Sequence, residues 1–259
     1  MDLGIRGRAA IVCGSSRGLG RACAESLARE GVNIVINGRT PETVAATASE
    51  LARSYAVTVI PVVADIDTVD GRLALLAAFA APDILVTNNA GPRPSEFATT
   101  DLDAWREALE SNMLAPLMLL QGVLEGMRAR RFGRIINITS AMVKSPHPLM
   151  TLSIGARTGL TGVTKALSKQ VVCDNVTINN LLPERFDTDR QRFMAELVMK
   201  ATGVSFEEAR AQQVATIAAG RLGEPAEFGD MCAFLCSAQA SYISGQNIQL
   251  DGGSYPGLL

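Results

Sequence analysis

The chain has 259 residues, with 24 basic and 26 acidic side chains, so its net charge at pH 7 is −2. Nearly balanced charge without a basic stripe argues against nucleic acid as the main partner. No apolar run approaches the ~20 residues that span a bilayer, and the first eight residues lack the apolar core of a signal peptide. Five cysteines without metal-ligand spacing, beside a single His, predict reduced thiols, no bound metal and a cytoplasmic location.

Short apolar runs alternate with helical patterns along the whole chain. Because these runs are apolar throughout, they are typical of strands covered on both faces. We expect seven strands, at 9–13, 32–36, 57–63, 84–87, 134–138, 177–182 and 247–250. Helical patterns lie between them, at 19–29, 41–53, 71–79, 102–127, 153–173 and 225–237.

This alternation predicts an α/β fold in which helices cover both faces of a doubly wound parallel sheet of about seven strands. We expect a single Rossmann-fold domain over residues 1–259. The charged, helical segment 184–220 breaks the alternation and follows the end of a strand, where ligands bind in such sheets. We expect this segment to form a lid over the substrate.

Three glycines stand between the first predicted strand and the first helix. Gly14 permits a tight turn, Gly18 lets the backbone approach a pyrophosphate, and Gly20 allows close packing of the helix. The positive end of the helix then faces the phosphate charge. The segment predicts dinucleotide binding, with a glycine-rich turn that binds nothing as the alternative. We count the following as cofactor-binding residues: Gly14, Ser16, Arg17, Gly18, Leu19 and Gly20.

The end of the second predicted strand indicates which dinucleotide is bound. The segment Asn37-Gly38-Arg39 has no acidic side chain for the ribose hydroxyls, and Arg17 can point at the same place. Two guanidinium groups suit a 2′-phosphate, because Arg binds phosphate oxygens through two parallel hydrogen bonds. We therefore expect NADP(H). The alternative is that Arg17 and Arg39 are solvated surface charges.

Segment 153–162 resembles the Tyr-x-x-x-Lys helix of short-chain dehydrogenases/reductases, and the resemblance covers essentially the whole chain. It is strongest to members similar to 3-oxoacyl-carrier-protein reductases, and includes the segments 88–91, 221–225 and 251–253. The family implies that Asp65 and Ile66 lie at the adenine and that Pro183 and Thr188 lie beside the nicotinamide. It adds three cofactor-binding residues after the fourth strand: Asn89, Ala90 and Gly91.

The resemblance also implies a catalytic set, from which this chain departs twice. Asn112 matches the Asn that holds a proton-relay water, and Ser140 matches the Ser that hydrogen-bonds the substrate carbonyl. Ser153 stands where the family has its proton-donating Tyr, and Arg157 stands where it has the Lys that lowers the Tyr pKa. A Ser hydroxyl is a far weaker acid, whereas Arg stays protonated and keeps a positive charge beneath the nicotinamide ribose.

Other residues were weighed as substitutes for the missing acid. We expect Tyr255 to reach an active site only across a subunit interface. Lys144 and His147 follow Ser140 in a loop that lines the substrate cleft of the family. His147 could act as an acid-base group and Lys144 could hold a carboxylate or phosphate, whereas the favoured alternative for each is a loop residue without such a role.

Three functions remain open at this point. The first is an NADP(H)-dependent oxidoreductase that acts on a small-molecule carbonyl/alcohol pair with an altered acid. The second is an inactive NADP-binding relative or partner subunit, and the third is a lyase or isomerase that uses Arg157 to bind an anion. Surplus apolar residues at 113–120, together with the assembly typical of the family, predict a homodimer or homotetramer. The alternative is a stripe buried in the core.

Overall fold

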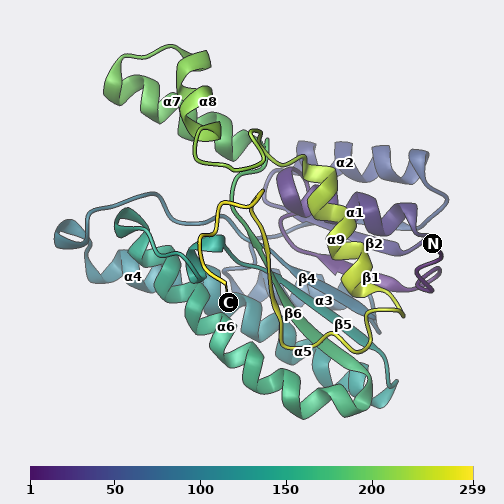
Figure 1. Cartoon of the computed structure of the whole chain (residues 1–259). Coiled ribbons are helices and arrows are strands. Elements are labelled where there is room, and N and C mark those ends of the chain that lie inside the picture. Colours follow the sequence, from purple (N-terminus) through teal and green to yellow (C-terminus); the bar gives the residue numbers. More distant parts are fainter. Residues whose placement is uncertain (259) are drawn as a thin grey trace.

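A sheet of seven parallel strands, ordered β3-β2-β1-β4-β5-β6-β7, forms the centre of the computed structural model, which describes residues 1–258 (Figure 1). The strands are β1 (Ala9–Val12), β2 (Asn33–Gly38), β3 (Val59–Val63), β4 (Ile84–Thr87), β5 (Gly133–Ile138), β6 (Val176–Pro183) and β7 (Asn247–Leu250). The order reverses between β1 and β4, so the prediction of a doubly wound parallel sheet is confirmed. Residue 259 of the predicted domain lies outside the described residues.

Helices cover both faces of the sheet (Figure 1). The helices on one face are α1 (Gly18–Arg29), α2 (Pro41–Ser54) and α9 (Pro225–Cys236). Those on the other are α3 (Val69–Ala78), α5 (Ala115–Ala129) and α6 (Thr151–Val171), with α4 (Leu102–Leu109) against α6. The helices α7 (Asp189–Thr202) and α8 (Phe206–Val214) project from the sheet as a pair.

Alternation along each central strand divides the core into two layers. Ala10 and Val12 of β1 pack in the layer with α1 and α9, whereas Ile11 and the following Cys13 pack in the layer with α5. The expectation that every strand is covered on both faces is wrong for the edges. The side chains of β3 and β7 are only partly buried, because each of these strands has one neighbour in the sheet.

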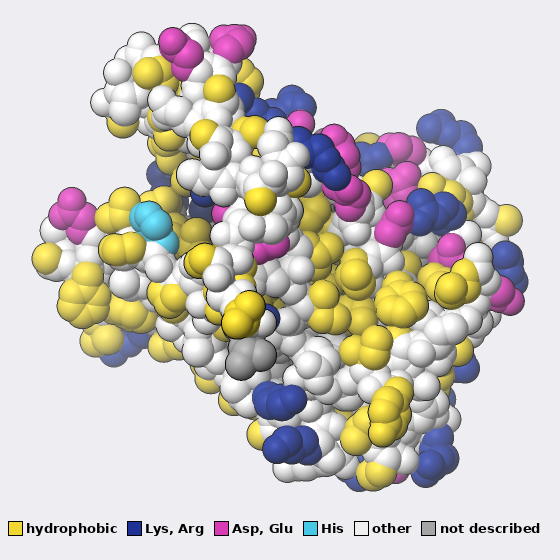
Figure 2. Space-filling model, in the orientation of Figure 1, with side chains coloured by type: hydrophobic (Ala, Val, Ile, Leu, Met, Phe, Trp, Pro, Cys, Tyr) yellow, Lys and Arg dark blue, Asp and Glu magenta, His cyan; other side chains and the backbone are white. Residues whose placement is uncertain are grey.

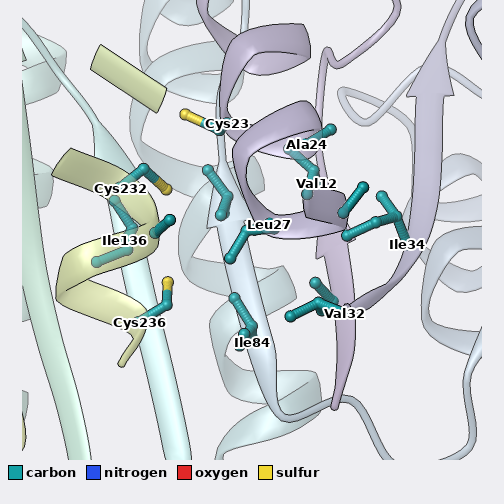
Figure 3. Packing of buried hydrophobic residues seen from close by; sticks show 14 of the residues in the cluster. Val12, Cys23, Ala24, Leu27, Val32, Ile34, Ile84, Ile136, Cys232 and Cys236 are labelled. Atoms are coloured by element: carbon teal, nitrogen blue, oxygen red, sulfur yellow. The ribbon is translucent and has the colours of Figure 1, made fainter. Parts of the chain in front are cut away.

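The contact between α1 and α9 is the closest approach of two helices on the first face. A Cβ on Gly229 of α9 would lie 2.3 Å from the carbonyl oxygen of Ala22 in α1, so only glycine fits there. On the same two helices, the thiols of Cys23, Cys232 and Cys236 are buried among aliphatic side chains (Figure 3). Burial raises the pKa of Cys236 well above its ordinary value, so this thiol stays protonated.

The segment 102–127, predicted as one helix, contains a break that bears on the site. A π-helical turn, η2 (Glu110–Leu114), separates α4 from α5 and carries Asn112. Such turns add a residue to the helical repeat and re-aim the side chains within them. The start of α3 also differs from the prediction. It begins at Val69 instead of Gly71, because the Thr68 side chain caps it by accepting from the Gly71 N–H.

None of the helices described within residues 1–258 is long and apolar enough to cross a membrane.

We expect Gly229→Ala to lower the free energy of unfolding by about 2 kcal/mol, because the added methyl group forces α1 and α9 apart. Urea unfolding followed by circular dichroism measures the change. Gly126→Ala in α5 is the matched control, since its new Cβ would meet only the flexible end of Arg130 at 3.1 Å. The close-packing interpretation is wrong if the two variants are equally stable.

Candidate active site

A cleft of about 560 Å³ opens at the carboxyl end of the sheet, where the strand order reverses. In Figure 2 basic side chains lie in the hollow beneath the α7–α8 pair. Almost every predicted site residue lines this cleft, although these residues come from all parts of the chain. Those that line it are Gly14, Ser16, Arg17, Gly18, Leu19, Arg39, Asp65, Ile66, Asn89, Ala90, Gly91, Ser140, Ser153, Arg157, Pro183 and Thr188.

Two predicted residues, Gly20 and Asn112, lie beside the cleft and do not line it. Gly20 acts through packing: a Cβ there would lie 2.3 Å from the carbonyl oxygen of Gly14. Gly14 and Gly18 adopt φ values of 53° and 59°, a left-handed conformation that favours glycine. The glycine turn therefore brings the start of α1 to the end of β1, as the sequence predicts.

Asn37 holds this turn in place, a role that the sequence did not reveal. It is 2% exposed, and its Oδ1 accepts from the Gly14 N–H at 3.1 Å. Its Nδ2 donates to the carbonyl oxygens of Val62 and Ala64 at 3.3 and 3.0 Å. One amide therefore ties the turn to the end of β3. A polar residue at the end of an apolar strand was the only signal for it.

Arg17 and Arg39 lie at one end of the cleft, and both are exposed. Arg39 Nη1 is 3.8 Å from Asp65 Oδ2, and more than a third of each side chain is exposed, so this pair stabilises the fold little. Arg17 forms no ion pair within residues 1–258. Both guanidinium groups can therefore bind an anion that enters this end of the cleft.

Ser153 and Arg157 form one hydrogen-bonded unit on α6 at the other end of the cleft. Both side chains are buried, and Arg157 Nε donates to Ser153 Oγ at 3.2 Å. Arg157 Nη1 donates to the carbonyl oxygens of Ile138 and Thr139, at 2.8 and 2.9 Å, at the end of β5. Because Ser153 Oγ already accepts from Arg157, its own O–H remains free to donate to another group.

Ser140 and Asn112 complete the predicted catalytic set. Ser140 Oγ accepts from the Met142 N–H at 3.2 Å, which also leaves its O–H free to donate. Asn112 is 4% exposed, and its Nδ2 lies 3.4 Å from the Ala90 carbonyl oxygen. Its Oδ1 is buried and accepts no hydrogen bond from residues 1–258. A buried oxygen of this kind is usually satisfied by a bound water.

Burial also shapes the charge of Arg157. The pKa of its guanidinium falls to about 10, first because burial disfavours the cation and second because Arg190 is positively charged. Arg157 is still protonated at neutral pH. Arg190 lies on α7, lines the cleft and donates through Nη2 to the Pro92 carbonyl oxygen at 3.2 Å. No motif in the sequence indicates it, although it stands two residues after Thr188.

The substitute acids weighed from the sequence do not line the cleft. His147 is exposed, and its Nδ1 accepts from the Leu149 N–H. Tyr255 does not line the cleft of its own chain, so its reach across a subunit interface stays a prediction. Its ring lies 5.9 Å from the Nζ of Lys144. In the part of the chain that the structure describes, no Tyr, Lys, His or Cys lines the cleft.

Glu184 lines the cleft and pairs with Arg185 at 3.5 Å. Within residues 1–258, no cluster of three His, Cys, Asp or Glu side chains is placed to hold a metal ion.

Comparison with known proteins shows the family to which this cleft belongs. The family described as enoyl-(acyl carrier protein) reductase matches residues 14–255. The chain belongs to the short-chain dehydrogenase/reductase family. It is 32% identical to the 3-oxoacyl-[acyl-carrier-protein] reductase of Aquifex aeolicus, over 98% of this chain and 100% of that protein. The corresponding reductase of Vibrio harveyi is 31% identical, over 98% of this chain and 99% of that protein.

Solved structures of this family share the whole fold. L-sorbose reductase from Gluconobacter frateurii, complexed with NADPH and L-sorbose, matches with a TM-score of 0.95 at 29% identity over 100% of both chains. A 3-oxoacyl (acyl-carrier-protein) reductase from Agrobacterium tumefaciens with NADP bound matches with a TM-score of 0.88. It is 28% identical, over 97% of this chain and 96% of that chain.

We expect Asn37→Ala to lower the free energy of unfolding by about 2 kcal/mol, because it leaves one buried N–H and two carbonyl groups without their partner. Thermal or urea unfolding measures this change. Asn33→Ala, on the same strand, is the control, because the hydrogen bond between its Oδ1 and the Thr58 N–H is exposed to water. A loss no greater than that of the control would show that Asn37 does not hold the turn.

Proposed function

We propose that this chain is an NADP(H)-dependent reductase of a small-molecule carbonyl compound, working with an altered catalytic set. One observation carries the proposal. A single cleft has a glycine turn with two exposed guanidinium groups at one end and, at the other, two Ser hydroxyls that can donate hydrogen bonds. The relatives named for reductase activity, and the related structures that hold NADPH or NADP, support it.

The residues present fit the cofactor. A side chain at Gly20 would collide with Gly14, and the close approach of α1 that glycine permits places the helix N-terminus at the cleft. Arg17 and Arg39 would hold the 2′-phosphate, and Asp65 and Ile66 would hold the adenine. Arg157 has a second terminal nitrogen, Nη2, that donates to nothing within residues 1–258. We assign it to the nicotinamide ribose.

Two Ser hydroxyls would bind the substrate carbonyl. Ser140 and Ser153 each accept one hydrogen bond from the protein and keep one O–H to donate. When bound, the cofactor supplies a hydride to the carbonyl carbon, and the carbonyl oxygen becomes an alkoxide. The donated O–H groups, with the buried charge of Arg157 behind Ser153, stabilise this oxyanion. The hydride and one proton together convert the ketone to the alcohol.

Water is the proton donor in this scheme. The cleft offers no Tyr or Lys in its described lining, whereas Asn112 has a buried, unpaired Oδ1 that would hold a water. Water is a poor acid, and loss of a matched general acid typically costs a factor of ~10² to 10⁴ in rate. We therefore propose slow turnover. The same absence of an acid favours a second candidate, an inactive NADP-binding relative that serves as a partner subunit.

The lid and the assembly are parts of the same proposal. Segment 184–220, with α7 and α8, would cover the bound substrate, since seven of its residues line the cleft: Glu184, Phe186, Thr188, Asp189, Arg190, Gln191 and Phe193. We also propose a homodimer or homotetramer. In the apolar run at 113–120, Leu119 and Leu120 are buried in the core, but Leu114 and Met118 are 41% and 44% exposed. This exposed part supports a subunit interface on α5.

We expect the double change Ser153→Tyr with Arg157→Lys to raise ketone reduction by roughly tenfold or more, because it restores an acid whose pKa a neighbouring cation can lower. NADPH oxidation at 340 nm with a panel of simple ketones measures the effect. Ser153→Phe with Arg157→Lys is the control, as it adds the ring without the hydroxyl. No gain in the Tyr variant would mean that the pocket has moved away from carbonyl reduction.

We expect the protein to bind NADPH more tightly than NADH, and Arg39→Gln to reduce that preference roughly tenfold, since one charge-assisted hydrogen bond is lost. Fluorescence titration of the cofactor-free protein with each dinucleotide measures both constants. Arg53→Gln on α2 is the control, because this exposed side chain lies outside the cleft. Equal affinity for the two dinucleotides in the unmodified protein would contradict the assignment of NADP(H).

A further inference from the structure

The catalytic end of the cleft holds arginines that have no carboxylate partner. Arg157 and Arg190 both line it, and Arg93 is exposed on the loop next to Pro92, the residue that Arg190 contacts. Within residues 1–258, none of these three guanidinium groups forms an ion pair. Elsewhere in the described residues, by contrast, most arginines form an ion pair with Asp or Glu.

The nearby carboxylates do not balance these charges. Glu184 lines the cleft but pairs with Arg185 at 3.5 Å, and Asp187 pairs with Arg210 at 2.7 Å. Asp189, at the start of α7, is the one acidic side chain of this end that lines the cleft without an ion pair in the described residues. The catalytic end therefore carries net positive charge.

The arginines also repel one another. Arg190 contributes to the lowered pKa of Arg157, and burial followed by the charge of Arg93 lowers the pKa of Arg190. Each of these effects means that the folded protein holds the cations less favourably than water does. An anion placed between them would remove that cost, and would do so most strongly in the closed cleft, where solvent screening is weakest.

We propose that the substrate carries a carboxylate in addition to its carbonyl group, and that Arg190 on the lid binds this carboxylate while Ser140 and Ser153 bind the carbonyl oxygen. This inference rests on the proposed reductase function and names its substrate class. Arg190 is suited to the role because it donates from Nη2 to the Pro92 carbonyl, and its other N–H groups donate to nothing within residues 1–258. Arg93 strengthens the positive field at the mouth of the cleft.

The assignment has a structural consequence for the lid. Arg190 joins α7 to the loop after β4 through its bond to Pro92, so the residue that binds the anion also holds the lid against the body. An anionic substrate would then draw the lid onto the cleft as it binds. A neutral analogue of the same size gains the Ser hydrogen bonds but not this contact.

The test compares 3-oxobutanoate with its neutral ethyl ester, which share the same reacting ketone. Steady-state reduction with NADPH gives kcat/KM for each, and quenching of bound NADPH fluorescence gives the affinity of the enzyme–NADPH complex without turnover. We expect the acid to be preferred, and Arg190→Met to reduce that preference roughly tenfold, as one charge-assisted contact is lost. Arg192→Met is the matched control: the same helix loses the same charge at an exposed position outside the cleft.

Each outcome bears on one proposal. A general loss for acid and ester alike would show that Arg190 only tethers the lid, and the inference falls. Weaker NADPH binding with an unchanged acid-to-ester ratio would assign Arg190 to the cofactor, and the inference also falls. If neither compound is reduced but the acid still binds the NADPH complex through Arg190, the anion site stands and the reductase function fails. Reduction of both compounds without any preference leaves the reductase function standing and overturns the anion site.

Discussion

The close approach of α1 to the end of β1 is the contact on which the cleft depends. Gly20 has no side chain, so the first turn of α1 can lie against the Gly14 carbonyl, and the Asn37 amide holds Gly14 to the neighbouring strands. The sheet reverses its strand order beside this point, which leaves a crevice between the loops that leave β1 and β4. The glycine turn, Asp65 and the hydroxyls of Ser140 and Ser153 all line that crevice.

Ser153 and Arg157 form a hydrogen-bonded pair at the end of the cleft opposite Arg17 and Arg39. Arg157 is fixed by two backbone carbonyls of β5, and through Nε it occupies a lone pair of Ser153. The two residues thus offer a hydroxyl donor and a buried positive charge. Under the proposed function this site would stabilise an oxyanion without protonating it quickly, and the proton would come from water beside the buried oxygen of Asn112.

The two ends of the cleft differ in how exposed their positive charges are and in how many carboxylates balance them. At the end that holds Arg17 and Arg39, both side chains are exposed, Arg39 lies near Asp65, and solvent screens these charges. At the other end, Arg157 is buried and Arg190 reaches from α7 to the Pro92 carbonyl, and few carboxylates balance the charges of these two arginines. Under the proposed anion site, this cleft would select its ligand by charge as well as by shape, and Arg190 would both bind the anion and hold α7 against the body.

The sequence by itself determined the sheet, the glycine turn and nearly all of the cleft lining, because these depend on local signals: apolar runs, glycines at a strand–helix junction, and motif spacing. It did not reveal the π-helical turn that carries Asn112, the amide bridge of Asn37, the position of Tyr255 beside Lys144 or the contact of Arg190 with Pro92. Those features arise from contacts between segments that are far apart in the chain. Only the tertiary structure decided them, since hydrogen-bond partners, burial and net local charge depend on which distant residues fold against one another.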